Sequence, residues 1–481
     1  MASVQTVPLE ILSTIFRFTV DQPSTQLHTA QMLTQYRNRI CTLVKLSLVC
    51  RKWRSTALCD GTLWATLPVH TSRADCQEST TTVLERSKHA MLDVSIVCDD
   101  VFDSPCEDIL LKISKNFDRI RSLHFATTSP GTLRSLSVPA TKLEVLEIFS
   151  AEQPTELGFL FGGNLPALRS LVLAGLPSWP LGLFANLKDL CLILPPSHPT
   201  VKVSSLIDVM SGSPNIEQIK MSAFLSMVDD SPPSALVRLP HLQKFMMHDC
   251  DSAMVLSHTI IPASADIKVV IDHRRMRETM HISSRDCHIL SSVPEDMSAM
   301  ESLRESTMLV LRQDQRVGFG IGFYRSRSPQ PSLRILDRSA SIGLFARRSI
   351  EVLASRSHHF RNIKDLSIAL SVGTTVPWLR LLRGFGRLER LSVVAFHASP
   401  ILSALTFAGQ ENRPICPALR RLDIYEKGDS HAFAFDREVM VEFFMARVVL
   451  RCAVAEVTIH RPGKRKTWKC RAFGGREVVR Y

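Results

Sequence analysis

Apolar and polar residues near the start of the chain alternate with the period of a helix. In VPLEILSTIF (7–16) and the residues just after it, apolar side chains recur at three- and four-residue spacings and share one helical face. Pro8 suits the first turn of a helix, where a missing N–H costs nothing, and Glu10 suits the positive end of the helix dipole. The predicted stripe consists of Leu12, Ile15, Phe16 and Thr19.

A second helical pattern covers LVKLSLVCRKWRSTALCDGTLWATL (43–67). Steps of three and four residues place one set of side chains on a single face. Gly61 then breaks the helix, and Leu63 and Trp64 add apolar surface. Spacing alone favours two ordinary amphipathic helices in a globular domain. The face consists of Leu43, Leu46, Cys50, Trp53 and Ala57.

Beyond these helices the pattern changes to six-residue words with apolar residues at positions 1, 4 and 6. Within each of two blocks the words start 19 to 31 residues apart, close to the leucine-rich repeat period of about 20–29 residues. The first block has MLDVSI (91–96), IRSLHF (120–125), LEVLEI (143–148), LRSLVL (168–173), LKDLCL (187–192), IEQIKM (216–221) and LQKFMM (242–247). The second block has IKDLSI (363–368), LERLSV (388–393) and LRRLDI (419–424).

A proline often stands two residues before a strand-like segment, as in Pro166-Ala-Leu168 and Pro417-Ala-Leu419. Such a proline ends the preceding element and favours an extended entry into the next. The Asn or Cys usual in leucine-rich repeats is mostly missing after the words. The region therefore resembles a degenerate leucine-rich array, and a conventional α/β domain is the alternative.

The N-terminal residues resemble an F-box, whose first part reads Leu-Pro-x-Glu-Ile-Leu-x-x-Ile-Phe and whose later parts read Leu-Val-Cys-Arg-x-Trp-Arg and Leu-Trp. Val7 replaces the usual leucine, and residues 21–39 form a longer polar insert than the family carries. The family divides the second piece into two short helices. The matching residues are Pro8, Glu10, Ile11, Leu12, Ile15, Phe16, Leu48, Val49, Cys50, Arg51, Trp53, Arg54, Ala57, Leu63 and Trp64.

The resemblance implies a partner rather than a reaction. An F-box docks on a Skp-type adaptor and, through it, on the cullin of an SCF-type (Skp–cullin–F-box) ubiquitin ligase. It implies adaptor contacts at Pro8, Ile11, Leu12, Ile15 and Val49. The residues expected to hold the small domain together are Phe16, Leu46, Cys50, Trp53, Leu63 and Trp64.

The strands of the repeats predict a recognition surface for an unknown protein substrate. Side chains alternate across a strand, so positions 4 and 6 of each word face the core and positions 3, 5 and 7 face the other side. Mixed charges with an aromatic residue are typical of a binding face, although a solvated strand face without ligand has the same pattern. The candidate substrate-binding residues are Lys220, Lys244, Arg390, Arg421, Asp423 and Tyr425.

Composition narrows the class of protein. Twelve cysteines occur without a Cys-x-x-Cys pair, which argues against a zinc finger, and the length argues against a disulfide scaffold. Reduced cysteines and an N-terminus unlike a signal peptide favour a cytoplasmic or nuclear protein. The uncharged run 170–187 contains prolines and glycines that fit a membrane helix poorly, so no membrane association is expected.

The sequence contains none of the common short motifs for catalysis, metal binding or cofactor binding. There is no Gly-x-Ser-x-Gly elbow and no phosphate-binding Gly-x-x-x-x-Gly-Lys loop. GFGIG (318–322) fits alternating glycines in a strand better than a dinucleotide fingerprint, and His358-His359 lacks a third metal ligand. We expect a protein without catalytic residues, cofactor or metal, and thus not an enzyme.

The net charge of +12 is concentrated at the C-terminal end, where residues 461–481 hold eight Lys or Arg and one Glu. A basic tail of this kind suits nuclear import, phosphate binding or nucleic-acid contact, but a solvated, poorly ordered end is the favoured interpretation and nucleic-acid binding is the weaker one.

The expected fold is a small helical F-box followed by a leucine-rich-repeat-like β-α solenoid, in the α+β or α/β class. The predicted parts are 1–68 (F-box with insert 21–39), 69–271 (first block), 272–332 (irregular or inserted), 333–460 (second block) and 461–481 (basic tail). The expected role is substrate recognition in an SCF-type ligase; a scaffold outside any ligase and a nucleic-acid-binding protein are the alternatives.

Overall fold

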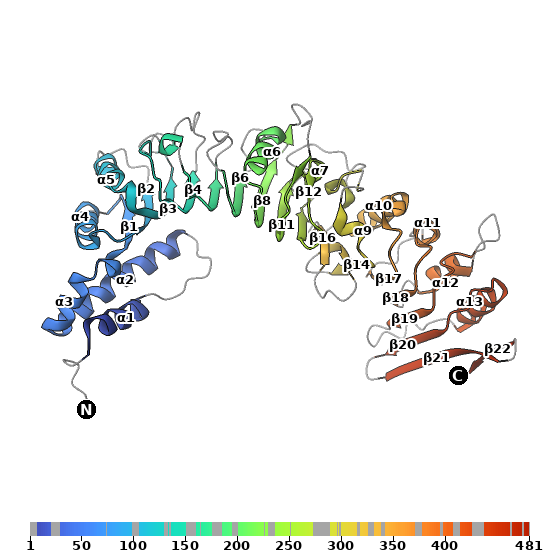
Figure 1. The fold of residues 1–481 in the computed structure, drawn as a ribbon. Coiled ribbons are helices and arrows are strands. Elements are labelled where there is room, and N and C mark those ends of the chain that lie inside the picture. The colour runs from blue at the N-terminus through green and yellow to red at the C-terminus, as the bar shows by residue number, and fades with distance from the viewer. Residues whose placement is uncertain are drawn as a thin grey trace. The chain divides into compact units, whose positions relative to one another are not determined.

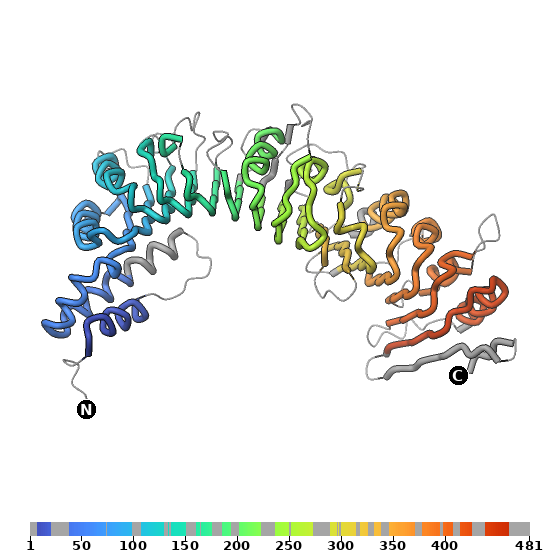
Figure 2. The backbone as a smooth tube through the Cα atoms, viewed as in Figure 1, coloured from blue at the N-terminus to red at the C-terminus, as the bar shows by residue number. Residues whose placement is uncertain are grey.

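The fold comes from a computed structural model of the whole chain, shown as a ribbon in Figure 1 and as a backbone tube in Figure 2. Contacts between residues divide it into two units, Met1–Val201 with Asp208–Ile216, and Lys202–Ile207 with Glu217–Tyr481. The structure describes residues 7–20, 29–73, 75–98, 105–128, 133, 136–150, 160–163, 165–175, 185–194, 201–225, 227–228, 236–250, 252–272, 289–295, 297, 300–314, 318–325, 331–337, 342–370, 378–394, 398–406, 414–425, 437–461, 464–473 and 476–480.

The first unit begins with helices and continues as strands alternating with helices. Its helical part has α1 (Leu9–Val20), α2 (Thr29–Val49), α3 (Arg51–Cys59) and the 3-10 helix η2 (Gly61–Trp64). The strands are β1 (Thr66–His70), β2 (Leu92–Cys98), β3 (Ile120–Thr127), β4 (Val145–Ser150), β5 (Ser170–Ala174), β6 (Asp189–Leu194) and β7 (Val201–Lys202). Between strands lie α4 (Cys76–Ser87), α5 (Pro105–Ser114), η3 (Phe117–Arg119) and η5 (Leu160–Gly163), and α6 (Val203–Gly212) is shared between the two units.

Strands β1 to β6 pair in chain order, each parallel to the next. Their register places the apolar positions 4 and 6 of successive words side by side, as the alternation predicted. Each buried Leu, Ile or Val side chain contributes about 1.5–3 kcal/mol, so these rows form the core of the array. One buried row is Leu67, Val94, Leu123, Leu146, Leu171 and Leu190, and the other is Val69, Ile96, Phe125, Ile148, Leu173 and Leu192.

The second unit contains further strands of the same kind. They are β8 (Gln218–Leu225), β9 (Met227–Val228), β10 (Val237–Arg238), β11 (Lys244–Cys250), β12 (Thr259–Ile260), β13 (Asp266–Ile271), β14 (Met308–Asp314), β15 (Gly318–Tyr324), β16 (Pro331–Asp337), β17 (Asp365–Ala369), β18 (Arg390–Val394), β19 (Arg421–Tyr425), β20 (Glu456–Arg461), β21 (Lys464–Phe473) and β22 (Arg476–Arg480). The helices are α7 (Ser252–Ser257), η6 (Ile289–Ser292), α9 (Glu301–Arg304), α10 (Ile342–Ser355), η7 (Ser357–Phe360), α11 (Trp378–Arg383), α12 (Ala398–Thr406) and α13 (Arg437–Val449).

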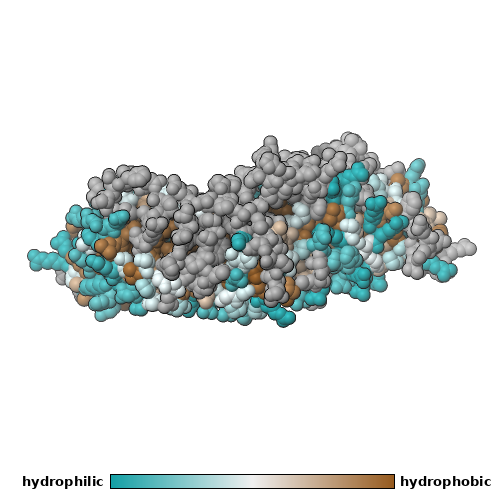
Figure 3. Space-filling view, turned by 90° about the horizontal axis from the view of Figure 1, so that it is seen from above, coloured by the Kyte–Doolittle hydropathy of each residue, from teal (hydrophilic) through white to brown (hydrophobic). Residues whose placement is uncertain are grey.

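Most strands of the second unit are parallel to their neighbours, and α10 to α13 lie on one side of strands β17 to β20 (Figure 1). Where the face in Figure 3 is coloured, hydrophilic side chains are interspersed with smaller hydrophobic areas. This mixture is expected where helices bury one apolar stripe and turn their polar sides to solvent. The long, mostly parallel β/α region therefore has the construction expected of a leucine-rich-repeat-like array.

One hairpin breaks the parallel order. Strand β15 runs antiparallel to both β14 and β16 and lies between them. Its Phe319, Ile321 and Phe323 are buried, and Gly320 and Gly322, which alternate with them, are buried as well. A Cβ at Gly320 would lie 2.8 Å from a methyl carbon of Leu336 on the neighbouring strand. Glycine therefore suits this position, because a neighbouring side chain packs closely against the backbone. Part of the segment 272–332, expected to be irregular or inserted, thus supplies regular strands.

The C-terminal residues also contain regular backbone. Strand β21 pairs antiparallel with β20, and β22 pairs antiparallel with β21. This arrangement differs from the poorly ordered end that the sequence favoured. An antiparallel hairpin therefore covers the outer edge of β20.

Candidate functional surfaces

The N-terminal helices are held together by an apolar core on one side of α1. Leu12 and Phe16 are buried, and the Phe16 ring meets the Trp53 ring edge-on with centroids 5.1 Å apart. The indole N–H of Trp64 donates to the Ala57 carbonyl at 2.7 Å. Among the expected core residues, Phe16, Leu63 and Trp64 are buried, and Leu46 and Trp53 are half-buried.

Cys50 differs from the sequence-based expectation. The spacing placed it on one helical face with Trp53, but its extended backbone (φ −158°, ψ 170°) ends α2 and starts α3. Its side chain is exposed, and its Sγ accepts the backbone N–H of Trp53 at 3.5 Å. Cys50 is thus the N-cap of a new helix and not a core residue, and the second piece is divided into two helices, α2 and α3.

Polar contacts around Asp60 fasten α1 to the end of α3. Its carboxylate accepts hydrogen bonds from the Ser13 hydroxyl, from the Arg17 guanidinium at 3.1 Å and from the Thr62 backbone N–H at 3.0 Å. Burial raises the pKa of Asp60, but these hydrogen bonds outweigh it and hold the pKa below the ordinary value. The carboxylate stays charged and keeps α1 in one orientation.

The opposite side of α1 exposes a second apolar stripe. Ile11, Ile15 and Phe18 follow at four- and three-residue spacings and are 53%, 47% and 81% exposed. Residues at this spacing lie on one helical face. An exposed helix face of large apolar side chains marks a protein-interaction site more often than a solvated surface.

Four of the five expected adaptor contacts are exposed. Pro8, Ile11, Ile15 and Val49 are exposed. Leu12 is only 2% exposed, because it points toward the core with Phe16, so it cannot contact a partner directly. Helical periodicity placed Leu12 and Ile15 on one stripe, whereas the structure turns them to different sides.

These helices also expose apolar residues that were not among the expected adaptor contacts. All of them are large apolar side chains that face solvent. The four-residue spacing of the two on α2 could have indicated from the sequence that they share one helical face. The residues are Leu9 and Phe18 on α1 and Val44 and Leu48 on α2.

A second candidate surface lies on strands β18 to β20. Asp423 is almost fully buried and accepts from the Arg390 guanidinium at 3.1 Å and the Arg421 guanidinium at 3.1 Å. The His460 ring lies 3.4 Å from the same carboxylate and stacks on Tyr425 at 4.3 Å between centroids. Three cationic or titratable groups and one exposed phenol ring are thus organised around a single carboxylate.

The charges explain how this cluster is held. Burial raises the pKa of Asp423, but the hydrogen bonds from Arg421 and His460 and the positive charges of Arg421 and Arg390 outweigh it and lower the pKa. The bond with Asp423 raises the pKa of Arg421. Since Asp423 is enclosed, a partner would meet the arginines and Tyr425, and Asp423 would orient them.

The remaining candidates, Lys220 on β8 and Lys244 on β11, lie elsewhere on the array. Lys220 is half-buried and Lys244 is exposed, on the side of the strands opposite the core, as the alternation predicted. In the sheet, β13, β16, β15, β14 and β17 separate β11 from β18. The structure therefore brings together Arg390, Arg421, Asp423 and Tyr425 but places the two lysines apart from them.

The described residues hold neither a metal-ligand cluster nor a helix long and apolar enough to span a membrane. They contain no group of three or more His, Cys, Asp or Glu side chains arranged to hold a metal ion. None of the helices in the described ranges combines the length and apolar content needed to cross a bilayer.

Comparison with known families identifies the N-terminal helices. Residues 4–68 match the F-box-like family, which covers α1, α2, α3 and η2. No curated protein sequence matches the chain. The chain thus has an N-terminal F-box-like domain followed by a long, mostly parallel β/α region.

Proposed function

We propose that a protein built from an F-box-like domain and a parallel β/α array serves as the substrate-recognition subunit of an SCF-type ubiquitin ligase. The F-box-like domain docks on a Skp-type adaptor, which links it to a cullin. The array holds a protein substrate. The chain itself performs no chemistry: it raises the local concentration of a substrate lysine near a ubiquitin carrier held by other subunits.

The observation that carries the proposal is the exposed stripe of Ile11, Ile15 and Phe18. The core contacts of Leu12 and Phe16 and the polar contacts of Asp60 hold the other side of α1 in place. A fixed amphipathic helix that presents apolar side chains at i, i+4 and i+7 is suited to a hydrophobic groove of a partner.

The Asp423 cluster supports the second half of the proposal. Arg390 and Arg421 present guanidinium groups that are oriented before any ligand arrives, so less side-chain entropy is lost on binding. Tyr425 is 44% exposed beside them. Arginine and tyrosine are the residue types enriched where protein interfaces bind most strongly.

Co-purification with a Skp-type adaptor and a cullin tests the proposal. We expect Ile15→Glu to reduce adaptor recovery by about tenfold or more, because a charge would be buried without a partner in an apolar interface. Gln77→Glu is the matched control: it adds the same charge at an exposed helical position outside residues 4–68.

Thermal unfolding of both variants separates docking from folding. The side chain of Ile15 is half exposed, so the melting temperature of the Ile15→Glu variant should lie within a few degrees of that of the unmodified protein. If the folded, unmodified chain binds no Skp-type adaptor, or if the two variants retain the adaptor equally well, the proposed docking is wrong.

A further inference from the structure

The last strands of the second unit extend the sheet face that carries Arg390 and Arg421. The register places Arg390 opposite Arg421, Arg421 opposite Glu456, and Glu456 opposite Lys469. Lys469 is in turn opposite Arg480 on β22. Residues directly opposite each other on paired strands share a face of the sheet. Strands β18 to β22 therefore contribute to one continuous face, which we call the basic face.

Strand alternation sorts the charges of the C-terminal hairpin between two faces. Lys464, Lys466 and Glu477 occupy the alternate positions of β21 and β22, on the side of the buried Val457 and Ile459. No acidic residue of these two strands shares the basic face. The basic residues of β21 and β22 whose positions lie on that face are Arg465, Lys469, Arg471, Arg476 and Arg480.

The two carboxylates on the basic face are already matched with cations. Asp423 is almost fully buried and holds Arg390 and Arg421, each at 3.1 Å. Glu456 lies 3.9 Å from the guanidinium of Arg421. With Arg390 and Arg421, seven Lys or Arg positions share the face with these two acids. The basic face thus has a large excess of positive charge.

An aromatic pair lies on the same face. The rings of Tyr425 and His460 are parallel to within 5° and their centroids are 4.3 Å apart. Tyr425 is 44% exposed, so part of its ring surface faces solvent. A planar base can add to such a stack whatever its identity, because every base has a π-face.

From these observations we infer that the basic face binds a single-stranded nucleic acid. Neighbouring strands lie about 4.8 Å apart, so the cations follow one another across β18 to β22 as a track for successive phosphates. Tyr425 and His460 offer a stacking platform beside that track. An acidic protein segment would match the charge but not the stack, and a duplex keeps its bases stacked on each other.

The pairing of β21 with β20 is the observation that favours this ligand. The sequence alone suggested a poorly ordered basic end, whose charges would each be solvated separately. In the structure the register fixes those positions beside Tyr425 and His460. Charge and aromatic surface are therefore combined in one place, as single-strand binding requires.

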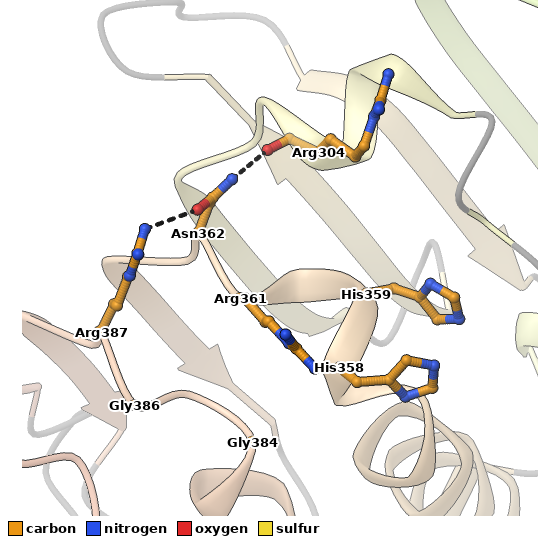
Figure 4. A pocket seen from close by; sticks show the side chains of 8 residues that line it. All are labelled: Arg304, His358, His359, Arg361, Asn362, Gly384, Gly386 and Arg387. Atoms are coloured by element: carbon orange, nitrogen blue, oxygen red, sulfur yellow. Dashed lines mark hydrogen bonds between the residues drawn. The ribbon is translucent and has the colours of Figure 1, made fainter.

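A second group of basic side chains in this unit supplies the control. It lines a pocket of about 560 Å³ at the turns before β14, β17 and β18, shown in Figure 4. There the Asn362 amide donates to the Arg304 carbonyl at 2.7 Å, and its oxygen accepts from Arg387 at 3.1 Å, so these residues join the turns. Arg361 at this pocket and Arg383 on α11 are exposed, which makes both suitable for neutral substitution.

Fluorescence anisotropy of the full-length protein tests the inference. The probes are a labelled mixed-sequence RNA of about 20 nucleotides, the DNA strand of the same sequence, the DNA duplex and a polyglutamate peptide of equal charge. We expect at least one single strand to bind about fivefold or more tighter than both the duplex and the peptide. Its affinity should fall steeply as salt rises, because bound phosphates release counterions.

Two variants of Tyr425 isolate the stacking contact. Tyr425→Ala should weaken single-strand binding by about fivefold or more, whereas Tyr425→Phe keeps the ring and should change it by less than about twofold. The side chain is 44% exposed, so both variants should melt within a few degrees of the unmodified protein.

A double substitution isolates the charge. Lys469→Gln with Arg480→Gln should make the slope of log affinity against log salt shallower by about 1.4, since each phosphate contact contributes about 0.7. Arg361→Gln with Arg383→Gln removes the same charge elsewhere and should leave the slope unchanged. Residues 4–68 are intact in all these variants, so adaptor recovery should stay normal. That readout separates a failure of this inference from a failure of the proposed function.

Three results would overturn the inference. They are binding of the duplex or of polyglutamate as tight as that of both single strands, equal affinities of Tyr425→Ala and Tyr425→Phe, or the same salt slope in the two double variants.

Discussion

Two arginines in the described part of the chain lie inside the fold rather than on its surface. Arg447 is fully buried and donates to the carbonyls of Ile415, Cys416 and Cys452 at 2.6–3.0 Å. Arg119 bonds the Leu84 and Ala90 carbonyls in the same manner. The planar guanidinium has enough donors to satisfy several turn carbonyls at once. Each such arginine fastens a turn to the segment beside it.

We predict that Arg447→Met lowers the free energy of unfolding by about 3–5 kcal/mol, because three buried carbonyls lose a charged donor. Urea unfolding followed by circular dichroism measures the change. Arg383→Met, at an exposed position of α11, is the control and should shift stability by no more than about 0.5 kcal/mol. Similar midpoints for the two variants would show that the buried bonds contribute little.

At the scale of the element, the break between α2 and α3 decides what the F-box-like domain exposes. One continuous helix would keep the stripe from Leu43 to Ala57 on a single face, whereas the extended backbone of Cys50 redirects the chain. Val49 and Leu48 are exposed at the end of α2, while Thr56 and Ala57 are buried in α3. The N-cap therefore separates residues free for a partner from residues of the core.

A stronger cap should stabilise this element. Sulfur accepts hydrogen bonds weakly, and serine is among the preferred N-cap residues. We expect Cys50→Ser to raise the free energy of unfolding by about 0.5–1 kcal/mol. Thermal unfolding of the full chain provides the measurement, with the exposed Cys59→Ser as control. A lower melting temperature for Cys50→Ser than for Cys59→Ser would contradict the capping role.

At the scale of the whole molecule, a parallel β/α array needs its last strand covered. An uncovered edge strand presents unpaired N–H and C=O groups to other chains. Here the antiparallel strand β21 pairs with β20, and β22 follows. The basic C-terminal segment thus has a structural role in addition to its charge.

Deleting residues 464–481 should therefore cause concentration-dependent self-association, because the edge of β20 is exposed. Light scattering over a concentration series would detect it. Deleting only 476–481 removes β22 but leaves β21 on β20, so this shorter deletion should remain unassociated at the same concentrations. Equal scattering by the two truncated proteins would exclude a covering role for β21.

Local patterns in the sequence were enough to identify the F-box-like helices, the strand words and the side of each strand that faces the core. Helix and strand periods depend only on neighbouring residues, so Phe16, Trp64 and the paired rows of leucines were recognisable directly. The alternation also placed Arg390, Arg421 and Tyr425 on one side of their strands.

Only the tertiary structure decided which residues meet. The rotation of α1 about its axis buried Leu12 and exposed Phe18, and no local pattern specifies that rotation. The converging charges around Asp423, and the pocket between Asn362, Arg361 and Arg387, join residues from different repeats. Such contacts depend on the register between strands far apart in the chain, which follows from packing the whole array.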